Sequence, residues 1–208
     1  MTAESSTLMK MLESDNWLQH RSEIISLRST DTWQLFLSAF NSLDRSALYE
    51  SRVHGQSHIE RVILLGSLLA EGCSLDEADT RLLLSICSYH DVGRVNDGYD
   101  LNHGYRSSLR IAELTGYQGD DLRMTQAITA AHSKNDADLE NTLISYQPYD
   151  FERCLNLARI FKDADGLDRV RIADLDPAFM RTERGRELVP FAQSLWEQYV
   201  FYEKNGQQ

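Results

Sequence analysis

The stretch that decides the fold reads Ser88-Tyr89-His90-Asp91-Val92-Gly93-Arg94. It sets a histidine beside an aspartate at the end of an apolar run in which Leu83, Cys87 and His90 share one helical face. A buried imidazole and a buried carboxylate both need polar partners, and a metal ion serves both. The pair therefore predicts a metal site, provided that other helices supply further ligands.

The composition of the whole chain favours helices. It has 208 residues with three prolines and scattered glycines, and period-two alternation of β-branched residues is scarce. Neither a repeat nor a low-complexity linker divides it, and the length is ordinary for one domain. We therefore expect an all-α fold, a single-domain helical bundle over residues 1–208.

Charge and cysteine content limit the compartment and the partners. A net charge of -11 argues against binding to a nucleic acid polymer or an anionic membrane, because such binding needs clustered Lys and Arg. Cys73, Cys87 and Cys154 form no close CxxC pair and indicate buried thiols in a reducing compartment. With no apolar run of membrane-spanning length, we expect a soluble cytoplasmic protein, either a monomer or a homodimer.

Histidines cluster in the middle of the chain. Five of the six lie between positions 54 and 132, namely His54, His58, His90, His103 and His132. Any one of them alone is most simply a hydrogen-bonded core residue. Converging on Asp91 and Asp165, however, they would form a costly polar cluster without an ion. Nitrogen and oxygen ligands suit a divalent Mn, Fe, Co, Ni, Zn or Mg ion.

Helix starts and faces show which side chains point inward. Ser57 and Ser74 each fit a capping box, so we expect them to open two helices, the first with His58 on its apolar stripe. Asp150 is expected to cap a later helix. On that helix Asp163 and Asp165 lie about 200° apart, so both cannot face one site. Asp165 shares the apolar stripe.

Three segments follow one another in order: His58-Ile59-Glu60-Arg61-Val62, His90-Asp91-Val92-Gly93-Arg94 and Asp163-Ala164-Asp165-Gly166-Leu167-Asp168. They resemble the HxxRV, HDxG(R/K) and DADxLD segments of the HD superfamily of metal-dependent phosphohydrolases. The resemblance implies a bundle of the HD-domain type with a metal-site core at about residues 54–172. Helices within 1–50 and a helix at 183–204 would pack on that core. The implied metal ligands are His58, His90, Asp91 and Asp165.

A second metal ion is one of two readings for the remaining histidines. Some members of the superfamily hold a further ion with two histidines between the HD pair and the last aspartate, and His103 and His132 stand there. The chain would then bind two ions bridged by Asp91. In the other reading, both histidines bind the phosphate of the substrate. The roles of His54, Asp163 and Asp168 are left open.

The resemblance also implies an activity. We expect a metal-dependent phosphohydrolase in which metal-bound hydroxide releases phosphate from a small phosphomonoester or a nucleotide. Its catalytic residues would be Asp91, Arg94, His103 and His132. Arg94, Lys134 and Arg169 would bind the phosphorylated substrate, although Arg169 could instead pair with a nearby acid such as Asp174.

Two other functions fit the same motifs. The first is a di-iron oxygenase with the HD fold, which would use the same ligands with extra histidines. The second is a non-catalytic, nucleotide-binding regulatory module in which the metal is structural. A helical scaffold with hydrogen-bonded core histidines is the plainest alternative. Neither the substrate, the metal nor the oligomeric state follows from the sequence.

Overall fold

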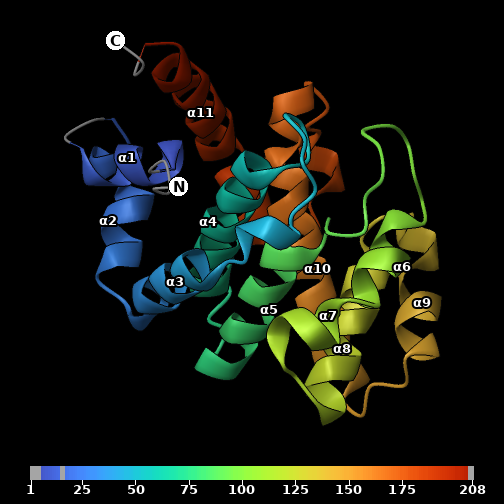
Figure 1. The fold of residues 1–208 in the computed structure, drawn as a ribbon. Helices are drawn as coiled ribbons and strands as arrows, with labels where there is room; N and C mark the ends of the chain where they lie inside the picture. The colour runs from blue at the N-terminus through green and yellow to red at the C-terminus, as the bar shows by residue number, and fades with distance from the viewer. Residues whose placement is uncertain (1–5, 15–16, 206–208) are drawn as a thin grey trace.

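Three long helices form the centre of the molecule: α4 (Gln56–Gly72), α5 (Glu77–Tyr89) and α10 (Phe151–Leu167) (Figure 1). The structure is a computed structural model and describes residues 6–14 and 17–205. Every residue of α4 from His58 to Ala70 is buried. A helix that is buried all round must be enclosed by others, and α5, α10 and α3 (Asp31–Ser42) all pack against it.

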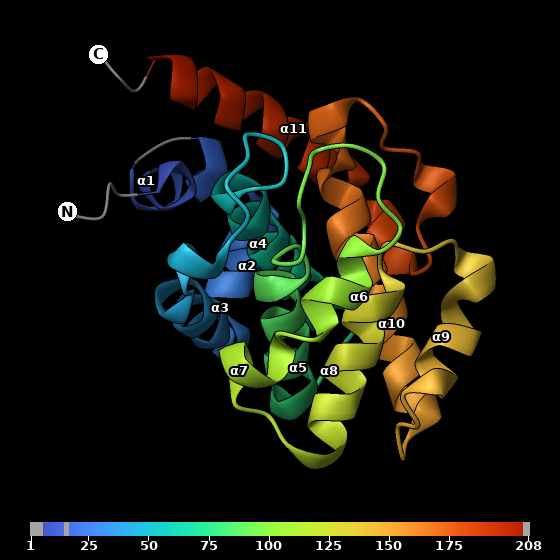
Figure 2. The same ribbon diagram turned by 45° about the vertical axis from the view of Figure 1, so that its right-hand side comes forward.

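Shorter helices cover the two sides of this centre. On one side lie α1 (Thr7–Glu13), α2 (Ser22–Arg28) and α3, and on the other α6 (His103–Ser108), α7 (Ile111–Thr115), α8 (Gly119–Ala131) and α9 (Leu139–Ser145) (Figures 1 and 2). The last helix, α11 (Glu183–Asn205), packs against α10, α4 and α1. Short 3-10 turns join these elements: η1 (Trp17–His20), η2 (Arg45–Ala47), η3 (Asp136–Asp138), η4 (Asp168–Ile172) and η5 (Pro177–Phe179).

The predicted all-α fold class is confirmed. Within the described residues there is no strand, and one hydrophobic core runs from Leu8 on α1 to Tyr199 on α11, so the helices pack as one compact domain. Residues 1–5, 15–16 and 206–208 of the predicted span 1–208 lie outside the description. In the same ranges, every helix is too short or too polar to cross a membrane.

Both capping-box predictions were wrong. The N-cap of helix α4 is Gly55, two residues before the expected Ser57. A Cβ at Gly55 would lie 2.1 Å from the carbonyl oxygen of Ser51, so the tight approach of the preceding turn sets this boundary. Helix α5 is capped by Asp76, whose carboxylate accepts a hydrogen bond of 2.8 Å from the backbone N–H of Asp79. The N-cap is Asp76 and not Ser74 because the backbone of Ser74 is left-handed, with φ 54°.

Asp163 anchors the start of α11. Its buried carboxylate accepts hydrogen bonds of 2.8 Å from the backbone N–H groups of Arg181 and Thr182 and from the Thr182 hydroxyl. It therefore lies on the side of α10 away from the histidines, and its role is structural. The Asp150 cap predicted for α10 is present, accepting from the N–H of Arg153 at 3.0 Å.

Removing the Asp163 anchor should destabilise the fold without touching the histidine cluster. Asp163→Ala leaves buried donors unpaired, so we expect the free energy of unfolding in urea to fall by about 3 kcal/mol. The control is Asp174→Ala, since Asp174 pairs with Arg169 at the surface and such pairs contribute about 0.5 kcal/mol. Equal losses in the two variants would contradict this role for Asp163.

Candidate metal centre

Five helices each bring a polar side chain to one point in the interior. His58 comes from the first turn of α4, His90 and Asp91 from the end of α5, His103 from the start of α6, His132 from the end of α8, and Asp165 from α10. His58 and His90 are fully buried and Asp91 is 2% exposed. The Asp165 side chain is 26% exposed. The cluster is thus closed on the core side and open at Asp165.

One group of ligand atoms lies between α4, α5 and α10. The Nε2 atoms of His58 and His90 are 3.1 Å apart. Oδ1 of Asp165 lies 3.4 Å from the first and 3.7 Å from the second. Oδ2 of Asp91 lies 3.7 Å from both. These are the four residues for which the sequence resemblance implies one ion.

The hydrogen bonds at the other ring nitrogens explain why this group suits a cation. Nδ1 of His90 lies 3.0 Å from the carbonyl oxygen of Cys87, and Nδ1 of His58 lies 2.7 Å from Oδ2 of Asp168. A carbonyl or an ionised carboxylate can only accept, so both Nδ1 atoms carry the proton. In the neutral rings the two Nε2 atoms therefore direct lone pairs at each other, and a bound cation would relieve that conflict.

A second group repeats this arrangement at the other oxygen of Asp91. The Nε2 atoms of His103 and His132 are 2.8 Å apart and lie 3.2 and 3.4 Å from Oδ1 of Asp91. Their Nδ1 atoms face the carbonyl oxygens of Asp100 and Thr129. Oδ1 of Asp91 is buried and has no hydrogen-bond partner in the described chain. Asp91 thus offers one oxygen to each group, as a bridging ligand would.

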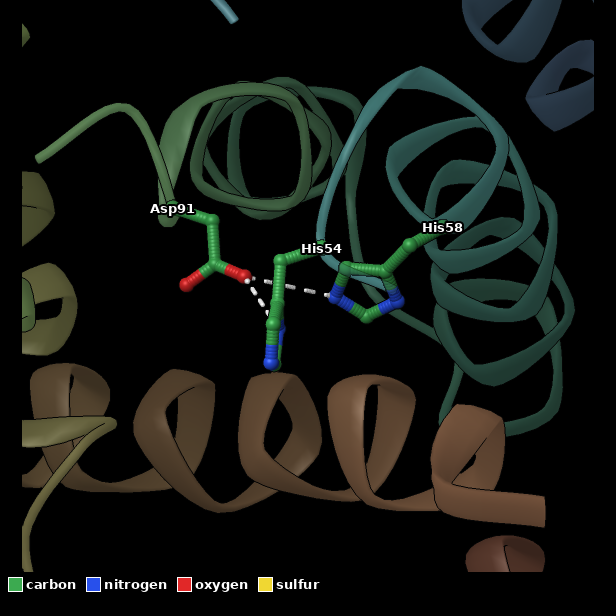
Figure 3. A group of neighbouring side chains, drawn as sticks. All are labelled: His54, His58 and Asp91. Carbon is green, nitrogen blue, oxygen red and sulfur yellow. Dashed lines mark hydrogen bonds and ion pairs between the residues drawn. The ribbon is translucent and has the colours of Figure 1, made fainter. Parts of the chain in front are cut away.

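His54 joins the cluster from the turn before α4. Figure 3 shows one oxygen of Asp91 directed at both His54 and His58, and Nδ1 of His54 lies 3.2 Å from this oxygen, Oδ2. Nη2 of Arg171 is also 3.2 Å from the same Nδ1. Because a guanidinium only donates, this Nδ1 accepts and bears a lone pair. His54, His58 and Asp91 could therefore hold an ion together, a role that the sequence did not assign.

Electrostatics keeps these groups in their ligand forms. Burial lowers the pKa of His90 to about 3, although Asp91 and Asp165 oppose the shift. Burial alone would raise the pKa of Asp91, but its interactions with His90, His103, His132 and His54 outweigh burial and hold that pKa well below its usual value. At neutral pH the His90 imidazole is therefore neutral and the Asp91 carboxylate ionised, the forms that bind metal.

Asp168 orients His58 from behind. Besides accepting from His58, its carboxylate binds Nε and Nη2 of Arg61 at 2.6 and 2.9 Å. Burial would raise the pKa of Asp168, but Arg61 and His58 lower it to about 2. The guanidinium of Arg61 lies 4.8 Å from the ring of Trp196 and 4.6 Å from that of Tyr199, both on α11. The last helix thus supports a metal-ligand candidate on α4 through two intermediates.

A cavity of about 780 Å³ opens over the cluster, with His54, His103, His132 and Asp165 in its wall. The three residues predicted to bind substrate, Arg94, Lys134 and Arg169, also line it. Nε of Arg94 lies 3.0 Å from Oδ1 of Asp91, and its Nη1 is buried without a hydrogen-bond partner in the described chain. Arg169 instead forms the ion pair with Asp174 that the sequence left open.

Comparison of the chain with protein-family models, with curated proteins and with solved structures finds no match. The resemblance to the HD superfamily therefore rests on the three sequence segments alone. The structure shows a helical domain with buried His and Asp groups that could hold a metal ion. Such a domain is compatible with the HD type.

Metal binding should depend on the cluster and on no other histidine. Loss of a group that only orients a ligand costs about 10–100-fold in metal affinity, so we expect His58→Ala to weaken binding by more than about 100-fold. Equilibrium dialysis against Mn²⁺, Co²⁺ and Zn²⁺ measures this effect. His20→Ala, at an exposed histidine on η1, is the control and should bind like the parent. Unchanged affinity in a folded His58→Ala variant would refute the site.

Proposed function

We propose that the protein is a metal-dependent phosphohydrolase that releases phosphate from a small phosphomonoester. The observation that carries the proposal is Asp91, which offers one carboxylate oxygen to each of two His groups, the second of which (His103 and His132) lines a cavity. The buried Nη1 of Arg94 at the same cavity supports an anionic substrate, because a buried guanidinium N–H needs an acceptor. The three segments that resemble the HD superfamily support the same activity.

The residues would have different roles according to their positions, some binding metal and others binding substrate. His58, His90, Asp91 and Asp165 would hold one divalent ion, and His103 and His132 would join Asp91 at a second. When bound, a metal ion lowers the pKa of a coordinated water and polarises a phosphoryl oxygen. Arg94 would donate hydrogen bonds to the equatorial phosphoryl oxygens, where charge grows in the transition state.

The reaction needs no redox partner. The oxygen of a water molecule forms a bond to phosphorus while the bond between phosphorus and the ester oxygen breaks. One proton of that water leaves it and the departing alkoxide gains one, so the products are an alcohol and inorganic phosphate. Asp91, which is 2% exposed and in contact with both His groups, would orient the water through its ionised carboxylate.

A di-iron oxygenase is the second candidate. The ligand set favours it, because a site with only N and O donors and one carboxylate shared by two groups of histidines would also suit iron. An iron content of about two atoms per chain, together with oxygen uptake and no phosphate release, would support the oxygenase. A nucleotide-binding module with a structural metal would instead bind nucleotide and release no phosphate from any ester.

Replacing Asp91 should abolish hydrolysis. The experiment loads the purified protein with Mn²⁺, Co²⁺, Ni²⁺ or Mg²⁺ and follows phosphate release from a panel of phosphomonoesters. Asp91→Ala removes a ligand from both groups, so we expect kcat/KM to fall by a factor on the order of 10³ or more. The matched control is Glu140→Ala, at an exposed acid on α9. Full activity in Asp91→Ala would refute the mechanism.

Arg94 should act on the substrate and not on the metal. Arg94→Met removes the donors but keeps much of the side-chain volume, so kcat/KM should fall by about 10²-fold while metal affinity stays within about twofold. Arg94→Lys keeps the charge without the bidentate geometry and should recover only part of the loss. Loss of metal together with activity would show that Arg94 supports the cluster and does not bind phosphate.

A further inference from the structure

The outer wall of the cavity is apolar and exposed. Tyr99 is 86% exposed, Phe179 69%, Ile172 43% and Leu101 41%, and all four line the cavity. They come from three separate segments: the loop between α5 and α6, which arches away from the helices in green in Figures 1 and 2, the end of η4, and η5. Single exposed apolar residues are ordinary, but four around one cavity form a binding surface.

The cations of the cavity lining other than Arg94 and Lys134 are already paired with acids. Nζ of Lys162 lies 3.0 Å from Oδ1 of Asp136, and Nη2 of Arg181 lies 2.7 Å from the same oxygen. Nη1 of Arg181 also lies 3.3 Å from Oδ1 of Asp163, so two carboxylates balance the two cations. Arg169 pairs with Asp174, as described above. Asp176 adds a further acid to the lining. A second phosphate would therefore meet cations that are already paired, and the carboxylate of Asp176.

Two cations of the cavity lining keep the capacity to bind an anion. Arg94 keeps its unpartnered Nη1 beside Asp91. Lys134 follows His132 by two residues and also lines the cavity. Its ammonium donates a hydrogen bond of 3.3 Å from Nζ to the Thr142 hydroxyl, and no carboxylate of the described chain lies within ion-pair distance of it. The cations of the cavity lining therefore fall into two sets: Arg94 and Lys134, which can accept one phosphate, and the paired cations, which leave no site for a second.

From this division we infer the substrate class: a monoester with a single phosphate whose alcohol carries an aromatic or apolar group. The phosphate lies at Arg94 and Lys134, and the alcohol extends towards Tyr99 and Phe179. The inference rests on the proposed function. It excludes polyphosphates and phosphate esters of small polar alcohols as preferred substrates. Aryl phosphate esters and nucleoside monophosphates both have the single phosphate and the ring that it requires.

Binding of phosphonates tests the apolar wall without catalysis. Calorimetry on the Mn²⁺-loaded protein compares benzylphosphonate with methylphosphonate, which have the same head group. Burying a ring should favour benzylphosphonate at least about tenfold. Tyr99→Ser with Phe179→Ser should reduce this ratio to about twofold without weakening methylphosphonate. Phe201→Ser, at a residue on α11 that is 63% exposed and outside the cavity wall, is the control and should keep the parent ratio.

The charge division is tested with a nucleoside monophosphate and its diphosphate, with metal in excess. Phosphate release should favour the monophosphate at least about tenfold in kcat/KM. Asp174→Asn should narrow this preference, because it frees Arg169 to bind a second phosphate.

The results separate this inference from the proposed function. Phosphate release with no preference for benzyl over glycerol esters, or equal binding of the two phosphonates, would overturn the inference and leave the function standing. A tenfold preference for benzylphosphonate with no phosphate release from any ester would overturn the function and leave the ligand class standing. Failure to bind either phosphonate would overturn the inference.

Discussion

The burial of one ionised carboxylate among five imidazoles is the constraint on which this structure depends. Asp91 is 2% exposed, and its oxygens lie within 3.7 Å of ring nitrogens of His54, His58, His90, His103 and His132. Four of these rings turn Nε2 inward because their Nδ1 atoms are fixed by carbonyl oxygens or by Asp168. The Nε2 lone pairs and the negative charge of Asp91 then meet at one point, and a bound divalent cation would resolve the conflict.

The rest of the fold supports this arrangement from a distance. Asp168 fixes His58, Arg61 fixes Asp168, and the rings of Trp196 and Tyr199 cover Arg61. A histidine near the start of α4 is therefore oriented by a helix that lies more than a hundred residues later in the chain. The same helix is anchored to α10 by Asp163. Asp163 and Asp168, which flank Asp165 in the sequence, therefore hold neighbouring parts of the fold in place.

The sequence could predict what local spacing determines. The apolar stripe shared by Leu83, Cys87 and His90 placed the HD pair on the core face, and the 200° separation on α10 distinguished Asp165 from Asp163. The capping boxes at Ser57 and Ser74 failed because stronger local determinants lay nearby, the close approach at Gly55 and the Asp76 cap. The roles of His54 and Asp168 could not be predicted, because their partners Arg171 and Arg61 lie 117 and 107 residues away in the chain.

The central claim is that this cluster holds metal through Asp91. Anomalous diffraction from crystals grown with Mn²⁺ or Co²⁺ tests it most directly, because the signal locates each ion. The account predicts an ion within about 2.3 Å of Nε2 of His58 and His90 and of oxygens of Asp91 and Asp165. If a second ion is bound, it should lie between Asp91, His103 and His132. Anomalous peaks only at surface carboxylates, with the cluster held by hydrogen-bonded water, would contradict it.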